Sequence, residues 1–263
     1  MPFDWTPDGK AVVFISYRTG RFNIYRQAPD QTVPDLLVAA ASQPVITARL
    51  SPYGSQLLYL VYPNWTGKAS AVSLMRMPLA GGAPQQVFAS NWISNQQCAR
   101  APATLCLYSV ESNNTFTILS FDPMKGNGSP VYQIKDDFAQ AYNWSLSPDG
   151  ATLAIAKGKV GEEESRIHLI SIKTGAERWM PVQDATGVST IDWAADSESL
   201  WATSSGEEEN TLLNVDLQGR TRVVWRPKRL TVHWAIPSRD GKSLALHVAS
   251  NSANAWMVER TDH

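Results

Sequence analysis

Residues 144–154 read WSLSPDGATLA, and this stretch decides the fold because copies of its central turn recur along the chain. The chain has three clear copies and three degenerate copies, and their central residues lie 45, 50, 46, 47 and 44 positions apart. A fixed period of this size indicates a repeat architecture. The copies are Pro7-Asp8-Gly9, Pro52-Tyr53-Gly54, Pro102-Ala103-Thr104, Pro148-Asp149-Gly150, Ala195-Asp196-Ser197 and Arg239-Asp240-Gly241.

Each repeat has the pattern of a four-stranded antiparallel meander. In the fourth copy, short alternating or apolar segments span residues 141–147, 152–156, 166–172 and 178–182. Such segments are typical of strands, and Asp149-Gly150 is a strong hairpin turn because glycine tolerates a positive φ. No segment has a helical stripe longer than about two turns, which excludes a βαβ plan.

Six such units predict an all-β fold, a β-propeller of about six four-stranded antiparallel blades around a channel. The last unit has strand segments at 232–236, 243–248 and 255–259 but no fourth. Two interpretations stay open: the ring closes with an incomplete blade, or the chain is the C-terminal part of a longer protein. We expect one domain over residues 1–263, with blades at roughly 1–40, 41–90, 91–137, 138–184, 185–229 and 230–263.

The composition narrows the class of protein. Hydrophobic residues make up 43% of the chain and charged residues 18%, as in globular proteins. The net charge is −1 with both signs interspersed, so nothing indicates a nucleic-acid partner. No stretch approaches the roughly 18 apolar residues of a membrane span, so we expect no direct membrane insertion. The first residues also lack the pattern of a signal peptide.

Four tryptophans occupy the same place in their repeats, three to six residues before the turn. In a propeller this zone is where neighbouring blades wedge together, so we expect these rings to pack between blades rather than to form a ligand cage. They are Trp5, Trp144, Trp193 and Trp234.

The third unit departs from the pattern because Cys98 and Cys106 flank its turn. If residues 101–103 form the bend, the two cysteines lie opposite each other on paired strands, at a separation that a disulfide can bridge. A disulfide would imply an oxidising compartment. The alternative is two reduced cysteines that pack as small hydrophobic residues.

The repeats resemble those of a known family. The phrase WSLSPDGATLA with RIHLISI at 166–172, and FDWTPDGK at 3–10 with FNIY at 22–25, resemble the TolB-type, WD-like propeller repeat. Residues 98–106, 191–197, 213–217 and 254–259 resemble more narrowly the C-terminal propellers of bacterial, especially acidobacterial, multidomain proteins. There the propeller follows a Ser/Thr protein kinase or a winged-helix domain, often after a membrane segment. The resemblance covers nearly the whole chain and implies a sensory or protein-interaction platform, periplasmic or extracytoplasmic if its parent is membrane-anchored.

Motifs for catalysis are missing from the sequence. It has no Gly-x-Ser-x-Gly nucleophile turn and no kinase signature, and its four histidines lack the spacing of metal ligands. We therefore expect no enzyme and no cofactor. The alternative is a propeller hydrolase or lactonase with a metal in the channel, for which Asn143, Asp192 and His233 are the inward-facing candidates.

The candidate ligand-binding residues lie in loops that the repeat places on one face. Two Glu triplets connect the second and third strands of consecutive units, where they would attract a basic segment or a cation such as calcium, or simply be solvated turns. Three aromatic residues belong to the same face and suit peptide recognition, unless their rings fold over blade edges. The candidates are Tyr62, Trp65, Trp92, Glu162, Glu163, Glu164, Glu207, Glu208 and Glu209.

These expectations favour a non-catalytic binding or sensory module that recognises a protein or peptide on its loop face. A regulatory accessory domain for an upstream kinase or winged-helix protein is a further alternative, which follows from the family resemblance alone.

Overall fold

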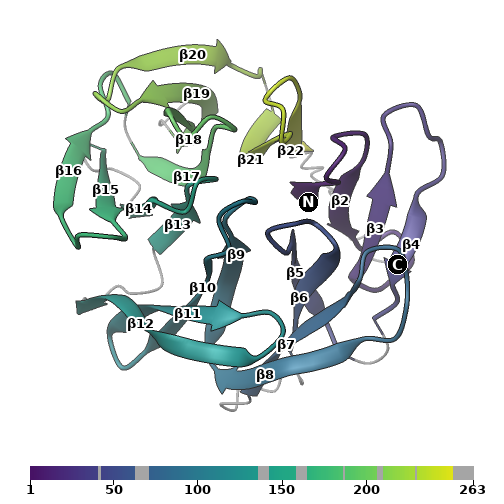
Figure 1. Cartoon of the computed structure of the whole chain (residues 1–263). Helices are drawn as coiled ribbons and strands as arrows, with labels where there is room; N and C mark the ends of the chain where they lie inside the picture. Colours follow the sequence, from purple (N-terminus) through teal and green to yellow (C-terminus); the bar gives the residue numbers. More distant parts are fainter. Residues whose placement is uncertain are drawn as a thin grey trace, which may run out of the picture.

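The computed structural model describes residues 1–40, 43–62, 71–135, 142–157, 165–185, 187–205, 210–228 and 230–250. All secondary-structure elements in these ranges are strands, β1 to β22. They form five four-stranded antiparallel sheets, and β21 and β22 form a two-stranded sheet. Figure 1 shows the sheets arranged as blades in a ring. The predicted propeller of about six blades is therefore confirmed, and the last blade is incomplete within the described residues.

The strands follow the chain around the ring, four to a blade. Their bounds are β1 (Pro2–Trp5), β2 (Val12–Ser16), β3 (Asn23–Gln27), β4 (Asp35–Val38), β5 (Val45–Leu50), β6 (Gln56–Val61), β7 (Ala71–Pro78), β8 (Gln85–Asn91), β9 (Ile93–Cys98), β10 (Cys106–Ser112), β11 (Thr115–Asp122), β12 (Gly126–Lys135), β13 (Tyr142–Leu146), β14 (Thr152–Lys157), β15 (Arg166–Ser171), β16 (Glu177–Pro181), β17 (Val188–Trp193), β18 (Ser199–Ser205), β19 (Asn210–Asp216), β20 (Thr221–Trp225), β21 (Leu230–Pro237) and β22 (Leu244–Ser250). The third strand expected for the last blade, at 255–259, lies outside the described residues.

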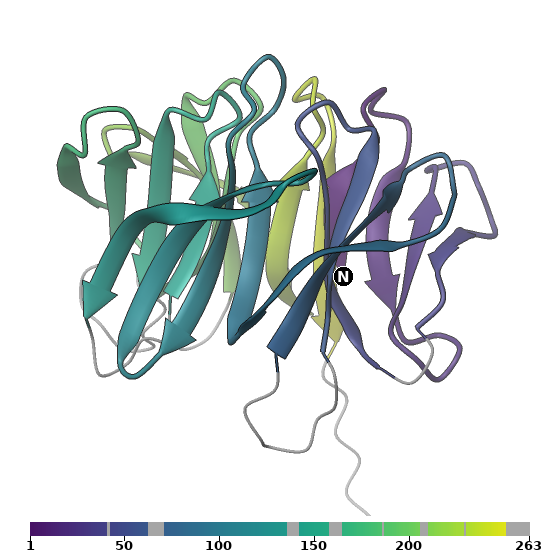
Figure 2. The ribbon, with the colours of Figure 1, turned by 60° about the horizontal axis from the view of Figure 1, so that its bottom comes forward.

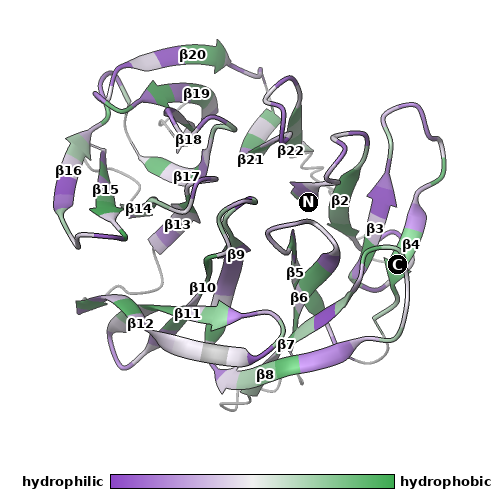
Figure 3. Cartoon of the chain, in the orientation of Figure 1, coloured by the Kyte–Doolittle hydropathy of each residue, from purple (hydrophilic) through white to green (hydrophobic). Residues whose placement is uncertain are grey.

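The middle strands of each blade carry most of the core. In β6 four consecutive residues are buried, whereas the outer strand β8 has no buried residue. Figure 3 shows the same contrast, with hydrophobic colouring on β2 and polar stretches on β8 and β12. Because neighbouring blades bury their sheet faces against each other, the hydrophobic clusters lie between blades, as in the cluster that joins the fourth and fifth.

The recurring turn is fixed by a hydroxyl and a carboxylate. In the first blade Thr6 Oγ1 donates to Asp8 Oδ1 (2.6 Å), and Asp8 Oδ1 accepts the Lys10 amide (3.1 Å). The hydrogen bonds from Thr6 and Lys10 lower the pKa of Asp8. The fourth and sixth blades repeat the network around Asp149 and Asp240. The sequence period therefore reflects the repeated use of the same hydrogen-bonded turn.

Polar side chains on the innermost strands tie each blade to the next. Asp4 Oδ2 accepts the Leu50 amide (2.9 Å), and Gln97 Oε1 accepts the Leu146 amide (2.9 Å). Two tryptophans add to these contacts as expected, because the Trp193 indole donates to Ser145 O (3.0 Å) and the Trp5 indole to Ile236 O (2.9 Å). The Trp5 bond joins the first blade to the sixth. A hydrogen-bonded inner ring thus holds the channel in shape.

Cys98 and Cys106 face each other at the hairpin end of β9 and β10. They form a directly opposed pair in the antiparallel register, and a disulfide bonds them. The bend between them includes residues 101–102, as the sequence predicted. The covalent bond therefore closes a hairpin whose turn has lost its glycine.

The propeller has two distinct faces. On one, which we call the hairpin face, lie the six recurring turns that join the first two strands of each blade. On the other, which we call the loop face, lie the first residues of the innermost strands β1, β5, β9, β13, β17 and β21. Figure 2 shows the hairpins at the top of the molecule, with the strands running down from them.

Candidate binding site in the central channel

The innermost strands of all six blades surround the channel. Contacts between β1, β5, β9, β13, β17 and β21 follow the ring in this order and close it between β21 and β1. A residue of the second blade can therefore meet a residue of the fifth only across the axis.

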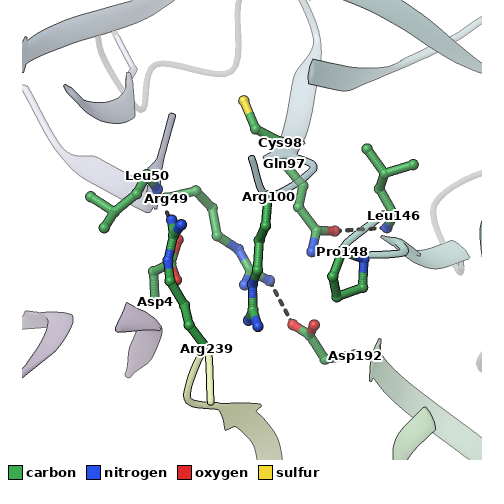
Figure 4. Close-up of a pocket in the computed structure, with 10 residues that line it drawn as sticks. All are labelled: Asp4, Arg49, Leu50, Gln97, Cys98, Arg100, Leu146, Pro148, Asp192 and Arg239. Carbon is green, nitrogen blue, oxygen red and sulfur yellow. Dashed lines mark hydrogen bonds and ion pairs between the residues drawn. The ribbon is translucent and has the colours of Figure 1, made fainter. Parts of the chain in front are cut away.

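One ion pair spans the axis near the hairpin face. Arg49 Nη2 lies 2.9 Å from Asp192 Oδ2, and these side chains are 12% and 7% exposed. Figure 4 shows the Arg49 side chain reaching from its strand to this carboxylate. Asp192 Oδ1 also accepts a hydrogen bond from Ser145 Oγ (3.3 Å). Such a buried pair is costly to break, because either partner alone would be an uncompensated buried charge.

Two further arginines reach the same place from the hairpin ends. Arg100 Nη2 donates to Pro237 O (3.3 Å), and Arg239 Nη1 donates to Pro52 O (3.2 Å). Burial lowers the pKa of Arg100; the negative charges of Asp4 and Asp192 oppose this in part, and the positive charges of Arg239 and Arg49 add to it. The remaining space is about 20 Å3, which is room for roughly one water molecule. The channel is therefore closed at the hairpin face.

On the loop side of Arg49 the channel widens into a cavity of about 250 Å3. All six blades contribute to its wall. We call this space the channel cavity, and its lining residues are Met1, Pro2, Phe3, Ile46, Thr47, Arg49, Ser94, Asn95, Glu111, Tyr142, Asn143, Trp144, Ile191, Trp234 and Ile236.

The cavity wall combines aromatic rings with a few polar groups. Trp144 Nε1 and Thr47 Oγ1 are buried there without a hydrogen-bond partner among the described residues. Burial also raises the pKa of Glu111, which lines the same space. A buried polar group without a partner lowers the stability of the folded protein by about 1–3 kcal/mol. A ligand or water molecule that forms a hydrogen bond with these atoms removes that penalty. An apolar concave wall with a small number of polar groups is typical of ligand sites.

The loop-face candidates from the sequence have mixed outcomes. Tyr62 does not expose its ring freely, because its hydroxyl donates to Ile93 O (2.5 Å) and burial raises its pKa to about 12. It therefore ties the second blade to the third. Trp92 is 51% exposed and has a φ of 62° in the turn between β8 and β9. Trp65 and the six candidate glutamates, Glu162 to Glu164 and Glu207 to Glu209, lie outside the described residues.

The three inward-facing candidates for a metal site take different positions. Asp192 lies in the ion pair with Arg49, and Asn143 lines the cavity while its Oδ1 accepts the Ile191 amide (3.0 Å). The ring of His233 packs near that of His247, with centroids 5.0 Å apart. Across the described ranges, no three His, Cys, Asp or Glu side chains gather as they would to hold a metal ion.

The sequence reasoning named Asp192 as inward-facing but missed its partner Arg49 and the other charged residues of the channel, and it gave Trp144 only a packing role. Trp144 is buried in the core as expected, but it also lines the cavity. The sequence did contain a signal for these charges. The position five residues before the last residue of the turn holds Asp4, Arg49, Ser145 and Asp192 in the first, second, fourth and fifth repeats. Residues at one repeat position lie at one level around the axis, so opposite charges there predict pairing across the channel.

The described part of the chain contains no helix with the length and apolar character needed to cross a membrane.

Comparison with known proteins identifies the fold alone. No family model and no curated sequence matches the chain. TolB from Acinetobacter baumannii is similar in structure, with a TM-score of 0.68 at 16% identity over 87% of this chain and 54% of that one. The chain thus spans about half the length of that protein. A putative TolB from Agrobacterium tumefaciens has a TM-score of 0.71 at 16% identity, over 95% of this chain and 89% of its own.

An enzyme is among the similar structures as well. An oligogalacturonate lyase in complex with manganese has a TM-score of 0.60 at 14% identity, over 84% of this chain and 63% of that one. The similar structures include the TolB proteins and an enzyme, all at 16% identity or less. Similarity at this level shows the fold and does not transfer an activity to this chain. The chain is a β-propeller that is structurally similar to TolB and to other propellers.

Proposed function

We propose that this protein is a non-catalytic binding or sensory module that recognises a protein or peptide segment on its loop face. The observation that carries the proposal is the asymmetry of the channel. Buried charged side chains close it at the hairpin face, and a cavity of about 250 Å3 lies on the loop side. A ligand that enters the channel therefore approaches from the loop face.

The size and chemistry of the cavity favour a peptide side chain as the occupant. Its volume lies below the roughly 300–1,000 Å3 of pockets for drug-sized ligands, so it suits one or two side chains of a larger partner. Aromatic walls such as Trp144 and Trp234 favour an apolar side chain, and Thr47 and Asn95 offer hydrogen bonds to its backbone. Exposed Trp92 supplies further contact area on the same face. The Glu triplets at 162–164 and 207–209 would favour a basic partner segment.

The disulfide supports an oxidising compartment for this module, such as a periplasmic or extracytoplasmic one. This agrees with the resemblance of the repeats to the propellers of multidomain signalling proteins, in which the module would regulate an effector domain. The compartment is tested by lysing cells of the natural host in the presence of an alkylating reagent and without reductant, and then measuring alkylation of the two cysteines. Cys98 and Cys106 should stay unmodified, and alkylation of both would contradict the assignment.

Peptide recognition is tested by selecting binders from a displayed random peptide library on the intact protein. The change Asn95→Tyr fills the channel cavity, so we expect it to weaken a selected peptide at least tenfold, about 1.4 kcal/mol. The matched control is Val223→Tyr on outer strand β20, where Val223 is 51% exposed, and it should leave the affinity unchanged. Equal affinity for all three proteins, or no selected peptide, would contradict the proposal.

A further inference from the structure

The buried charges that close the channel do not balance. Among the ten residues that line the small space near the hairpin face, three are arginines and two are aspartates. We call these five residues the axial cluster: Asp4, Arg49, Arg100, Asp192 and Arg239. Its formal charge is therefore +1. An excess charge in a space of low polarity is costly unless an opposite charge accompanies it.

The two carboxylates are already engaged. Asp4 accepts the amides of Trp5 (2.8 Å) and Leu50 (2.9 Å). Asp192 accepts from Arg49 (2.9 Å) and Ser145 (3.3 Å). Each carboxylate therefore has about two of its roughly four acceptor positions filled within the described residues.

Each arginine keeps one buried N–H group without an acceptor among the residues that the structure describes. These atoms are Arg49 Nε, Arg100 Nη1 and Arg239 Nε. Figure 4 shows the guanidinium groups of Arg49 and Arg100 overlapping in this view, with that of Arg239 beside Asp4. Within the described ranges, the side chains of Arg100 and Arg239 donate to carbonyl oxygens, Pro237 O and Pro52 O. Three unpaired N–H groups thus belong to residues that line a small space, and the two carboxylates of that lining leave one positive charge uncompensated.

The space itself limits what can fill it. It measures about 20 Å3, which admits roughly one water-sized particle. A phosphate or sulfate ion has five heavy atoms and cannot enter without displacing the arginines. A monatomic anion matches the size, the single negative charge and the three N–H donors together.

We propose that the axial cluster is a binding site for one monovalent anion of chloride size, held by the guanidinium groups of Arg49, Arg100 and Arg239. The anion neutralises the cluster and joins the second, third and sixth blades at the axis. It therefore stabilises the folded ring, because the unfolded chain has no such site. The site is independent of any partner on the loop face.

The test measures thermal unfolding of the intact protein at constant ionic strength while chloride replaces gluconate. A saturable rise in Tm of several degrees is expected, since ligand that binds only the folded state raises Tm with its concentration. Bromide should act like chloride, and sulfate should not give a saturable rise. Crystals grown in bromide should show one anomalous peak beside Arg49 Nε.

Two variants separate this site from general salt effects. Arg239→Gln brings the formal charge of the cluster to zero while the Arg49–Asp192 pair remains, so its Tm should no longer respond to chloride. Arg220→Gln is the control, because Arg220 pairs with Asp216 on the surface and is 68% exposed; it should keep the full response. An equal response in wild type and Arg239→Gln would overturn the proposal. So would bromide crystals of the unmodified protein without the peak, a result that does not depend on the folding of any variant.

Discussion

At the scale of single residues, the channel is closed by side chains that pair across the ring. Arg49 and Asp192 are 143 positions apart in sequence but 2.9 Å apart in space. Ser145 accepts a hydrogen bond from the next blade, whereas Arg49 at the same repeat position crosses the axis instead. One repeat position thus serves two purposes, assembly of the ring in some blades and closure of the channel in others.

His168 is another residue that joins two blades. It is 2% exposed on β15, and its ring stacks on that of Trp179 with centroids 4.1 Å apart. Glu177 lies 2.9 Å from its Nε2, and the Tyr132 hydroxyl of the third blade lies 3.5 Å from its Nδ1. Burial lowers the pKa of His168, and half-exposed Glu177 opposes this in part. The folded state therefore favours neutral histidine.

Acid should destabilise the protein through His168. Its pKa is lower in the folded state than the value of 6.5 in the unfolded one, so the unfolded chain binds the proton more readily. The stabilisation is complete above pH 6.5 and is lost as the pH falls below that value. His168→Phe keeps an aromatic ring against Trp179, so its unfolding free energy should fall less between about pH 7 and pH 5.

Chemical denaturation at several pH values checks this. Burial also lowers the pKa of His247, but that residue is present in both proteins. The difference between wild type and His168→Phe therefore isolates His168. Parallel pH profiles of the two proteins would show that His168 does not contribute.

At the scale of elements, the recurring hairpin keeps its geometry where its sequence has changed. Gly9, Gly54, Gly150 and Gly241 have φ values between 68° and 73°. In the degenerate fifth copy Ser197 takes the glycine position and still has a φ of 64°. The hairpins also touch one another, because the Arg100 amide donates to Pro148 O (2.7 Å) and the Ala101 amide to Pro52 O (3.1 Å).

The close contact between hairpins predicts a stability difference between two glycine substitutions. A Cβ on Gly54 would lie 2.2 Å from Pro7 Cγ in the neighbouring blade, whereas one on Gly175 would meet nothing within 4 Å. Their φ values, 73° and 67°, carry a similar backbone cost. Gly54→Ala should therefore destabilise the protein by about 1–3 kcal/mol more than Gly175→Ala. Urea unfolding measures both, and equal losses would mean that the hairpins are not tightly packed.

Most strands could be predicted from the sequence because each repeat carries its own turn and alternation. In the fourth blade β13, β14, β15 and β16 begin and end within about one residue of the predicted segments. The opposed cysteines followed from the same reasoning, since register on a hairpin is set by its bend. Tyr62 could not be placed, because its partner Ile93 belongs to another blade and no local pattern reports that contact.

At the scale of the whole molecule, closure of the ring determines where a ligand can bind. The period of the repeats was enough to predict a propeller, but it did not predict the depth or the shape of the channel. Closure at the hairpin face depends on the signs of charges in blades that lie on opposite sides of the ring. The cavity depends on which innermost side chains are small, and both are properties of the assembled ring rather than of one repeat.

The central claim is that ligands bind at the loop-face mouth of a channel that is closed at the hairpin face. Hydrogen exchange with and without a peptide selected from the library tests it most directly. We predict protection at the first residues of β5, β9 and β13, around Ile46, Asn95 and Asn143, and none at the turns around Pro52 and Pro148. Protection at those turns, with none around Asn95, would contradict the claim.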